Sequence, residues 1–432
     1  LHLCDRRQRQ MCIRDRYFME RVNIGVIGLG QRGSGLLDTI LAIKEARVVA
    51  VSDIYEDRRA AAAEKVEKKY GEKPAAYADY REMLSDKNVA AVLITAGWEE
   101  HIRIAVESMR AGKITAMEVG GAYDVEECWE LVRTYEQTGT PVMMMENCCY
   151  DRFELLATAM ARAGKFGEIV HCHGAYSHDL RDEIMGGNVN RHYRLNNYMH
   201  RNCENYPTHE LGPIAKILGI NRGNRMISLV SVASKAAGLR EFAKTDKNPD
   251  KSLENATFRQ GDIVNTVITC ANGETISLKL DTTLPKYYSR EFTVRGTKGL
   301  CLQEANMVFL EEKCYSHEFF EPERTIEKYL NNAKEYEEEF LPDIWKNITE
   351  EDKELGHGGM DFLMFKDFFK RILEGRELAV DVYDAAAWMC ISALSEQSVA
   401  LGGAPVAIPD FTNGQWVKRP LSDVVDFSYL KK

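Results

Sequence analysis

The feature that most constrains the fold is a glycine-rich turn that follows the first apolar run of the chain. The turn reads Gly28-Leu29-Gly30-Gln31-Arg32-Gly33. In such a turn the first glycine allows a tight bend, the second lets the backbone approach a pyrophosphate, and the third lets a helix pack on the preceding strand. Asp53 ends the next apolar run, twenty residues after Gly33, where a carboxylate accepts hydrogen bonds from ribose hydroxyls. The pattern predicts a bound dinucleotide, and NAD rather than NADP because this acid disfavours a 2′-phosphate.

Short apolar runs alternate with helical segments as far as Asn147. We expect strands within 22–30, 47–53, 88–96, 114–119 and 141–147. We expect helices at 36–45, 56–70, 99–111 and 125–139, with Gly112 and Gly139 ending the last two. Strand–helix repetition of this kind is typical of a parallel, doubly wound sheet. We therefore predict that residues 20–147 form an NAD-binding Rossmann domain of the α/β class.

The pattern changes after Asn147, although the composition does not. After a helix at 152–164, further strands are expected at 168–178, 226–234, 262–270, 274–282, 291–297 and 306–312. Asn272-Gly273 between two of them is a strong hairpin signal, so this sheet should be mostly antiparallel. The charge-rich stretch 321–354 reads as surface helix and loop, and apolar helices at 361–373 and 383–401 close the chain. We predict that residues 148–432 form a substrate-binding α+β domain with a large open sheet.

Charge and cysteine usage exclude several classes of protein. The formal net charge is −10 and the isoelectric point is near 5.6, which argues against nucleic-acid binding. No apolar segment has the length of a membrane span. The 11 cysteines show no paired metal-ligand spacing, so we expect reduced thiols, no metal and a cytoplasmic protein.

The first residues do not resemble the start of such a fold. Residues 1–18 lack both the apolar core of a secretory signal and a clear amphipathic period. We interpret Met19, which directly precedes the first strand, as the biological start, and residues 1–19 as a non-native or disordered leader. An export signal lost from the upstream sequence remains the open alternative.

Trp98 and His101 stand at the start of the helix that follows the strand expected at 88–96. This edge of the sheet is where a nicotinamide lies. For Trp98 a cofactor contact and a packing role are both open. His101 either contacts the cofactor or caps and packs its own helix.

Tyr206 and His209 are three residues apart in "NYPTHELGP", just before an apolar helix. This spacing places both side chains on one face of a helical turn, where a histidine can take a proton from a sugar hydroxyl. The alternative is a buried histidine bonded to a backbone carbonyl. Glu146 ends the strand expected at 141–147, at the junction of the two expected domains, where a carboxylate is placed for chemistry. Its alternatives are a helix N-cap and a salt bridge.

Two further segments carry polar side chains at expected element ends. "GAYSHDLR" offers Tyr176, His178 and Asp179 at the end of a strand. "GHGGMDF" offers His357 and Asp361, and its glycines allow close approach of the backbone before a helix begins.

These stretches together resemble a known family along nearly the whole chain. From about residue 20 the sequence is similar to the superfamily named for glucose-fructose oxidoreductase, inositol dehydrogenase and a rhizopine-catabolism protein. Within it the chain resembles glycoside hydrolase family 109, the NAD-dependent α-N-acetylgalactosaminidases. The motifs that carry this resemblance are "MEVGGAY" with "EECW", "ENCCY", "GAYSHDLR", "YPTHELGP", "NRGNR", "SKAAGL", "QGDIV", "GHGGMDF", "DVYDAA", "LSEQSV" and "IPDFTNGQW".

The resemblance implies a hydrolysis that begins with an oxidation. Tightly held NAD⁺ accepts hydride from C3 of the sugar, a base removes the acidified C2 proton, and the C1 substituent is eliminated. Water then adds and the hydride returns, so the cofactor is recycled without net redox change. Sugar dehydrogenases of the superfamily usually carry Glu-Lys-Pro where this chain has Glu118-Val119-Gly120. Absence of the lysine is part of the pattern of family 109.

The resemblance also assigns residues. The positions that match the family's sugar pocket are Glu146, Tyr176, Arg194, Tyr206, His209 and Tyr288. His209 with Tyr206 is expected to be the base at the C3 hydroxyl, Tyr176 or Glu146 handles the C2 proton or the leaving oxygen, and Arg194 and Tyr288 hold substrate. Glu118 is expected near the nicotinamide ribose. This sequence departs from the pattern in a short insert after "HDLR" and in Tyr193, where a tryptophan is expected, and both bear on the substrate.

Two other functions compete with this interpretation. A plain NAD-dependent sugar or inositol dehydrogenase would accumulate NADH from added NAD⁺. A catalytically silent dinucleotide-binding regulator would have no need for four polar groups at one junction. The expected substrate is a small molecule or glycan with a terminal N-acetylhexosamine, and a homo-oligomer formed through the open sheet is expected.

Overall fold

The computed structural model describes residues 20–313 and 322–430, so the expected leader lies outside the described residues. The described chain divides into two compact units. Unit 1 comprises the chain as far as Glu118 together with Glu130–Met145 and Ile348–Val382. Unit 2 comprises Val119–Trp129, Glu146–Asn347 and the chain from Tyr383 onward. Two segments therefore depart from a single division near residue 147, because each packs with the unit on the other side of it.

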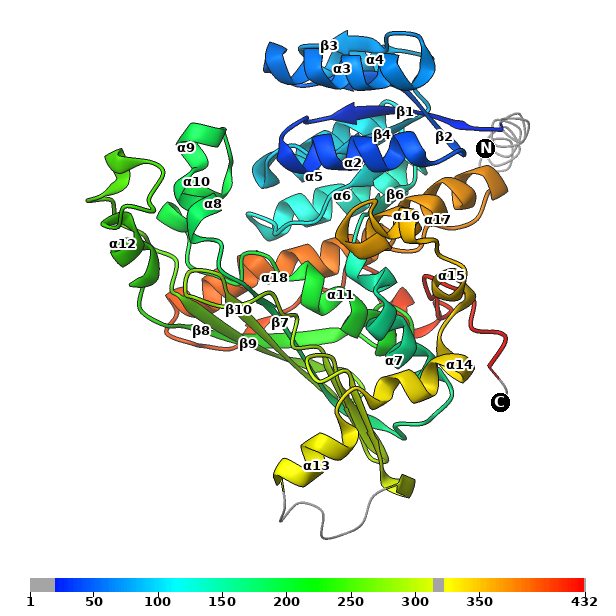
Figure 1. Cartoon of the computed structure of the whole chain (residues 1–432), viewed down its shortest axis with the longest axis vertical. Helices are drawn as coiled ribbons and strands as arrows, with labels where there is room; N and C mark the ends of the chain where they lie inside the picture. Colours follow the sequence, from blue (N-terminus) through cyan, green and yellow to red (C-terminus); the bar gives the residue numbers. More distant parts are fainter. Residues whose placement is uncertain (1–19, 314–321, 431–432) are drawn as a thin grey trace. The chain divides into compact units, whose positions relative to one another are not determined.

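Unit 1 is a doubly wound sheet of six parallel strands in the order β3-β2-β1-β4-β5-β6 (Figure 1). Its strands are β1 Val22–Ile27, β2 Ala46–Ser52, β3 Ala75–Tyr77, β4 Ala91–Ile94, β5 Ile114–Met117 and β6 Val142–Met144. Its helices are α2 Gln31–Ala42, α3 Glu56–Tyr70, α4 Tyr80–Ser85, α5 Trp98–Arg110, α16 Glu350–Lys353 and α17 Met360–Glu374, together with the part of α6 Val125–Thr138 that follows Trp129. This strand order is that of dinucleotide-binding domains, which confirms the predicted Rossmann fold.

The late segment Ile348–Val382 joins unit 1 because its longest helix packs on the first strand and helix of the chain. Helix α17 contacts both α2 and β1. Its buried side chains include Phe365, Phe368 and Phe369, which are fully buried. The sequence predicts this helix correctly but gives no sign of which sheet it covers.

Unit 2 contains a sheet of eight strands in the order β13-β12-β11-β7-β10-β9-β8-β14. Its strands are β7 Ile169–Ser177, β8 Met226–Ala233, β9 Ile263–Cys270, β10 Thr275–Asp281, β11 Thr293–Gly296, β12 Gly299–Leu302, β13 Met307–Leu310 and β14 Val406–Ala407. Only β7 and β10 pair in parallel; every other neighbouring pair in this sheet is antiparallel. The expected hairpin is present between β9 and β10, where Gly273 has a φ of +100°. The prediction of a mostly antiparallel sheet is confirmed.

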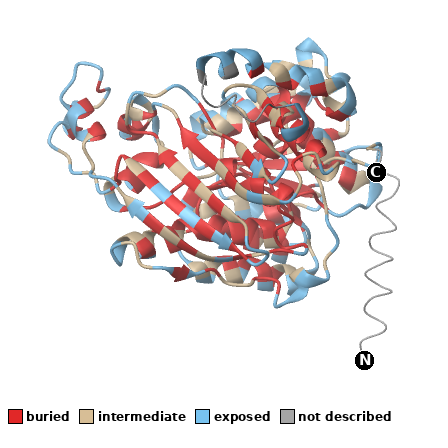
Figure 2. Ribbon diagram, turned by 90° about the horizontal axis from the view of Figure 1, so that it is seen from below, coloured by how far each residue is buried: buried red, intermediate tan, exposed pale blue. Residues whose placement is uncertain are grey.

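One face of this sheet is covered and the other is open. Along β9 buried residues alternate with exposed ones, and Figure 2 shows the same alternation on neighbouring strands. The covered face packs against helix α11, Thr208–Ile217, which contacts both β7 and β10. The other helices of unit 2 are α7 Arg152–Arg162, α8 Arg181–Met185, α9 Gly187–Asn190, α10 Arg194–His200, α12 Gly238–Ala243, α13 Pro322–Tyr329, α14 Glu337–Phe340, α15 Asp343–Lys346 and α18 Val382–Ala400.

The stretch expected as surface helix and loop is largely helical but not wholly on the surface. Tyr336, Phe340 and Leu341 are at most 7% exposed, so apolar side chains between the charges anchor it. No helix among the described residues is both long and apolar enough to cross a membrane.

Candidate functional site

The glycine-rich turn in unit 1 is shaped by steric contacts at its first and third glycines. Gly28 has a φ of +90°, and a Cβ there would lie 2.6 Å from the backbone nitrogen of Ala96. A Cβ on Gly33 would lie 2.1 Å from the carbonyl oxygen of Gly28. At Gly30 the nearest atom would be the Arg58 guanidinium at 3.5 Å, so the backbone is open there. Helix α2 begins directly after this open position, and its N-terminal N–H groups favour a phosphate.

Asp53 braces this turn from the end of β2. Its Oδ2 accepts a hydrogen bond from the backbone N–H of Leu29 at 2.7 Å, and its Oδ1 accepts one from Tyr55 at 2.9 Å. An ionised carboxylate has lone pairs for further donors, so these bonds leave acceptor capacity for ribose hydroxyls. The open backbone at Gly30 and the acceptor at Asp53 fit a bound dinucleotide.

Arg32, inside the turn, is held by two carboxylates of unit 1. Its guanidinium donates to both oxygens of Asp361, at 2.7 and 3.0 Å, and to Oε1 of Glu118 at 3.1 Å. Burial acts to raise the pKa of Asp361, but Arg32 and then His357 hold this pKa well below its ordinary value. Gly356 has a φ of +80°, and a Cβ there would lie 2.4 Å from Oδ2 of Asp361. The close approach expected of the "GHGG" glycines is therefore made to the carboxylate that holds Arg32.

Trp98 and His101 are both buried at the start of α5. Nε2 of His101 lies 2.9 Å from the carbonyl oxygen of Ala96, and burial lowers the histidine pKa to about 4. The neutral ring of His101 therefore holds in place the backbone at Ala96, against which Gly28 packs. This arrangement favours the packing interpretation of His101. Glu118 and Val119 are also buried, at 4% and 2% exposed.

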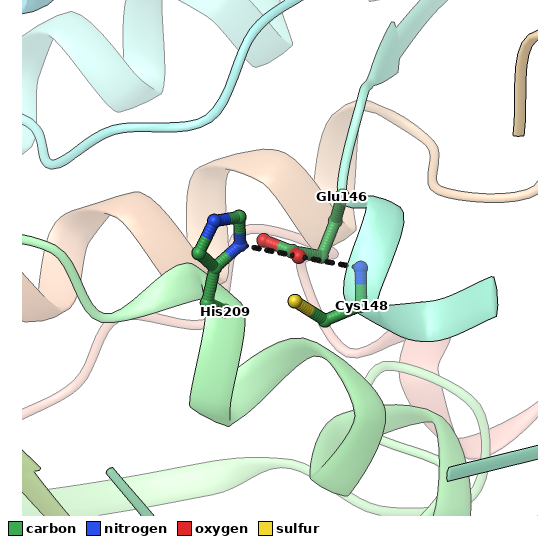
Figure 3. A group of neighbouring side chains, drawn as sticks. All are labelled: Glu146, Cys148 and His209. Carbon is green, nitrogen blue, oxygen red and sulfur yellow. Dashed lines mark hydrogen bonds and ion pairs between the residues drawn. The ribbon is translucent and has the colours of Figure 1, made fainter. Parts of the chain in front are cut away.

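In unit 2 three predicted residues form a hydrogen-bonded chain. Nδ1 of His209 lies 2.7 Å from Oε1 of Glu146, and Nε2 lies 3.3 Å from the Tyr206 hydroxyl (Figure 3). Because a carboxylate only accepts, Nδ1 carries a proton toward Glu146, and in this tautomer of the imidazole Nε2 accepts from the Tyr206 hydroxyl. Glu146 also accepts from the backbone N–H of Cys148 at 3.0 Å and so caps the 3₁₀ helix η1, Asn147–Tyr150. The expected site contact and its alternative, an N-cap, are thus both made by one carboxylate.

The Glu146 carboxylate is fully buried. Burial acts to raise its pKa, but His209 and the N–H of Cys148 hold the pKa of this carboxyl below its ordinary value. The residue is therefore ionised at neutral pH and orients the imidazole. A buried anion of this kind strengthens the acceptor nitrogen on the far side of the ring.

Aromatic rings and one arginine surround this chain. The Tyr176 ring lies 4.6 Å from the Tyr206 ring and 5.6 Å from the His209 ring, between centroids. The guanidinium carbon of Arg194 lies 5.0 Å from the centre of the Tyr206 ring and 6.0 Å from that of Tyr176. Burial raises the pKa of Tyr176 to about 12, although Arg194 opposes this shift. Tyr176 is therefore a neutral phenol, able to donate a proton.

The ring of His178 contacts both Tyr176 and Tyr288, and so links Tyr288 to this group. The His178 ring is 4.9 Å from Tyr176 and 5.2 Å from Tyr288, between centroids. The Tyr288 hydroxyl accepts a hydrogen bond of 2.9 Å from Arg290, while 47% of the residue is exposed. Burial, and then Arg194, lowers the pKa of His178 to about 4. Asp179, at the same strand end, instead forms an ion pair of 2.6 Å with Arg181.

Sequence reasoning missed three groups near these residues. Arg290, which anchors Tyr288, is buried against Glu154 and Asp151 in a loop that carries no motif. The Cys148 thiol lies beside Glu146 and His209, and the adjacent Cys148-Cys149 pair was the available signal. Glu204, just before Tyr206, is a fully buried carboxyl whose oxygens have no hydrogen-bond partner among the described residues.

Comparisons with known proteins agree with both halves of this description. Residues 22–146 match the model of the oxidoreductase family with an NAD-binding Rossmann fold, and residues 150–418 match the glycosyl hydrolase 109 C-terminal domain. The chain is 36% identical over 421 residues to an alpha-N-acetylgalactosaminidase of Tannerella forsythia, covering 92% of this chain and 88% of that protein. It is 35% identical over 425 residues to a glycosyl hydrolase family 109 protein of Stenotrophomonas maltophilia strain K279a, covering 92% and 91%.

Solved structures agree on the fold. Levoglucosan dehydrogenase in complex with NADH and levoglucosan has a TM-score of 0.65 at 18% identity, covering 90% of this chain and 100% of that one. A putative myo-inositol dehydrogenase of Sinorhizobium meliloti 1021 has a TM-score of 0.59 at 17% identity, with the same coverage. These dehydrogenases share the architecture, and the match to residues 22–146 identifies an NAD-binding domain. By the family model that matches residues 150–418 and by identity along most of the chain, the protein belongs to glycoside hydrolase family 109.

Proposed function

We propose that this glycosidase removes terminal α-linked N-acetylgalactosamine from glycans by oxidation at C3, elimination, addition of water and reduction. The observation that carries the proposal is the Glu146–His209–Tyr206 chain in a protein that also has a complete dinucleotide turn. The choice of sugar rests on the relative from Tannerella forsythia, which is named for this activity.

The residues of unit 1 would hold the cofactor. Asp53 would bind the ribose hydroxyls, the backbone at Gly30 would admit the pyrophosphate, and Glu118 would lie near the nicotinamide ribose. When bound, NAD⁺ supplies a reversible hydride acceptor for C3 of the sugar. We propose that it is retained through turnover, since each cycle returns the hydride to product.

His209 would take the proton from the C3 hydroxyl. Glu146 accepts the Nδ1 proton, which leaves Nε2 as the basic nitrogen and stabilises the imidazolium that forms. The Tyr206 hydroxyl donates to this nitrogen at 3.3 Å, so it marks where the hydroxyl of a sugar would sit. Ionisation of Glu146 makes this residue better suited to hold the base than to donate a proton itself.

The remaining roles follow from charge and exposure. Tyr176 is a neutral phenol with a pKa of about 12, which suits a donor to the leaving oxygen more than a base at C2. Arg194, beside both tyrosine rings, would bind a sugar hydroxyl or stabilise the enolate that elimination requires. Tyr288, half-exposed with an anchored hydroxyl, offers a flat apolar face for a sugar ring.

The test follows the hydrogen at C2, since only elimination breaks that bond. Hydrolysis of a nitrophenyl α-N-acetylgalactosaminide in D₂O is expected to give product sugar with deuterium at C2. A thioglycoside is expected to be cleaved as well, since elimination needs little protonation of the leaving group. Full activity after complete removal of NAD, with no label at C2, would contradict the mechanism.

The same assay separates the two competing functions. A sugar or inositol dehydrogenase would accumulate NADH from added NAD⁺ and release no nitrophenol. A silent regulator would do neither, although it would retain the nucleotide. A panel of nitrophenyl glycosides of both anomers identifies which sugar, and which of its anomers, the enzyme cleaves.

We also propose a homo-oligomer formed through the open sheet of unit 2. Ile227, Val232 and Val267 on β8 and β9 are 37 to 52% exposed, so this sheet presents apolar side chains to solvent. Light scattering of Val267→Lys tests this, since a buried charge at that face would dissociate the oligomer. An unchanged mass would contradict it.

A further inference from the structure

Three side chains of different ligand chemistry meet at the Glu146–His209 contact, and the proposed mechanism uses only two of them. Nδ1 of His209, a carboxylate oxygen of Glu146 and Sγ of Cys148 all lie within 4.8 Å of one another. The residues are 8%, 0% and 1% exposed, respectively. Figure 3 shows the thiol of Cys148 directed into the space beside the carboxylate and the imidazole. Imidazole nitrogen, carboxylate oxygen and thiolate sulfur are the ligand types that Zn²⁺ takes in proteins.

The cluster also has unused acceptor capacity and suitable spacing. Oε2 of Glu146 is buried without a hydrogen-bond partner among the described residues. A tetrahedral zinc ion with bonds of about 2.0–2.3 Å keeps its ligand atoms about 3.3–3.8 Å apart. To reach this spacing, the 2.7 Å distance between Nδ1 of His209 and Oε1 of Glu146 would have to lengthen by about 1 Å or less, and Sγ of Cys148 would have to move closer to both atoms.

We infer that Glu146, Cys148 and His209 form a latent site for a thiophilic divalent cation of the zinc class, and that its occupation inhibits the enzyme. The Cys148 thiol releases its proton to solvent as the metal–sulfur bond forms, and Nδ1 of His209 releases the proton it shares with Glu146. With the ring and the carboxylate both bound to a cation, Nε2 loses the anion that supports it as a base. The inhibitory part rests on the proposed function, whereas the binding part does not.

The ligand set predicts which cations bind. Mg²⁺ and Ca²⁺ prefer oxygen ligands, so neither is expected to compete with Zn²⁺ here.

The test compares two neighbouring cysteines in the full-length protein. Cys149 is also buried and adjacent in sequence, but it is not part of the ligand group, so Cys149→Ser is the matched control for Cys148→Ser. Zn²⁺ affinity is measured by competition with a chromogenic chelator. We expect a loss of at least about 100-fold in Cys148→Ser, more than the loss of an outer-shell partner typically costs, and little change in Cys149→Ser. Equal affinity in all three proteins, or equal losses in both variants, would overturn the site.

Spectroscopy and kinetics then separate this inference from the proposed function. With Co²⁺ as the probe, a thiolate charge-transfer band is expected in the wild type and in Cys149→Ser, and its absence from both overturns the site. Zn²⁺ should inhibit glycoside cleavage by the wild type at concentrations that leave the rate of Cys148→Ser unaltered from its own metal-free value. A protein that binds Zn²⁺ through Cys148 yet cleaves no glycoside retains the site and loses the proposed function. An active glycosidase that neither binds Zn²⁺ nor is inhibited by it supports the proposed function and overturns the metal site.

Discussion

The candidate cofactor site of unit 1 is built mainly from backbone, whereas the candidate sugar site of unit 2 is built from side chains that contact one another. In unit 1 the turn is set by steric contacts at Gly28 and Gly33, and its charged groups are paired within the protein, Arg32 with Asp361 and Glu118. In unit 2 the functional atoms form a relay in which Glu146 and Tyr206 bond to the two ring nitrogens of His209.

This difference predicts how each site responds to substitution. A backbone site binds through many N–H groups, so the loss of one side chain should weaken binding by degrees. A relay transmits a proton through single atoms, so the loss of one member should remove the chemistry. The predictions below test that contrast.

The largest effect is expected at the centre of the relay. His209→Ala should lose roughly 10²–10⁴ in kcat, the usual contribution of a positioned general base. Its NAD content should remain close to that of the wild type, because His209 belongs to unit 2 and the glycine turn to unit 1. Its unfolding temperature should fall, because the buried carboxylate of Glu146 loses its partner. Stopped glycoside assays measure kcat, and nucleotide release after denaturation measures the NAD content. A variant that loses NAD along with activity would show that the two sites are not separable in this way.

Replacement of Asp53 should have a smaller and different effect. Asp53→Asn keeps the size of the side chain but loses the charge that accepts from the ribose hydroxyls. Hydrogen bonds to a charged acceptor contribute roughly 1.5–3 kcal/mol, so NAD affinity should fall by about 10- to 150-fold. With saturating NAD the rate should recover, which His209→Ala cannot do. Nucleotide content equal to that of the wild type would count against Asp53 as a cofactor ligand.

The sequence predicts local features well and distant pairings poorly. The turn at Gly28–Gly33 and the hairpin at Asn272-Gly273 are specified by residues next to one another, and both are present. Strands β3, β12 and β14, which are two to four residues long, were not predicted.

The candidate site shows the same limit. Tyr206 and His209 were predicted together because helical spacing joins them. The partner of Asp361 was not predicted, since Arg32 is 329 residues away and no pattern links the two motifs. Glu204 escaped notice because an acidic residue is normally assigned to the surface.

The pair of Arg32 and Asp361 offers a test at the border between binding and stability. Asp361→Asn removes the anion that accepts two hydrogen bonds from Arg32, so the free energy of unfolding should fall by about 1–3 kcal/mol. The pKa of Asp361 is lower in the folded than in the unfolded protein. Its stabilising contribution is therefore present above the unfolded pKa and is lost as the pH falls through the folded value.

Thermal unfolding as a function of pH checks this expectation. The difference between wild type and Asp361→Asn should be largest at neutral pH and should shrink in acid. NAD retention should weaken only slightly in the variant, because the backbone of the turn remains in place. A loss of NAD as large as that of Asp53→Asn would show that Arg32 acts directly on the cofactor.

The smallest effect is expected to be a gain. Glu204, directly before the relay residues, is fully buried, and burial raises its pKa from 4.5 to about 8. The folded protein therefore holds a proton that the unfolded chain has released, so stability falls as the pH rises from about 4.5 to about 8 and then levels off. Glu204→Gln keeps the shape of the neutral acid and has no proton to hold. Its unfolding temperature should match that of the wild type near pH 4.5 and exceed it by a few degrees at pH 8, as measured by calorimetry. A variant that is less stable at every pH would show that the Glu204 carboxyl is engaged by a group that stabilises its charge.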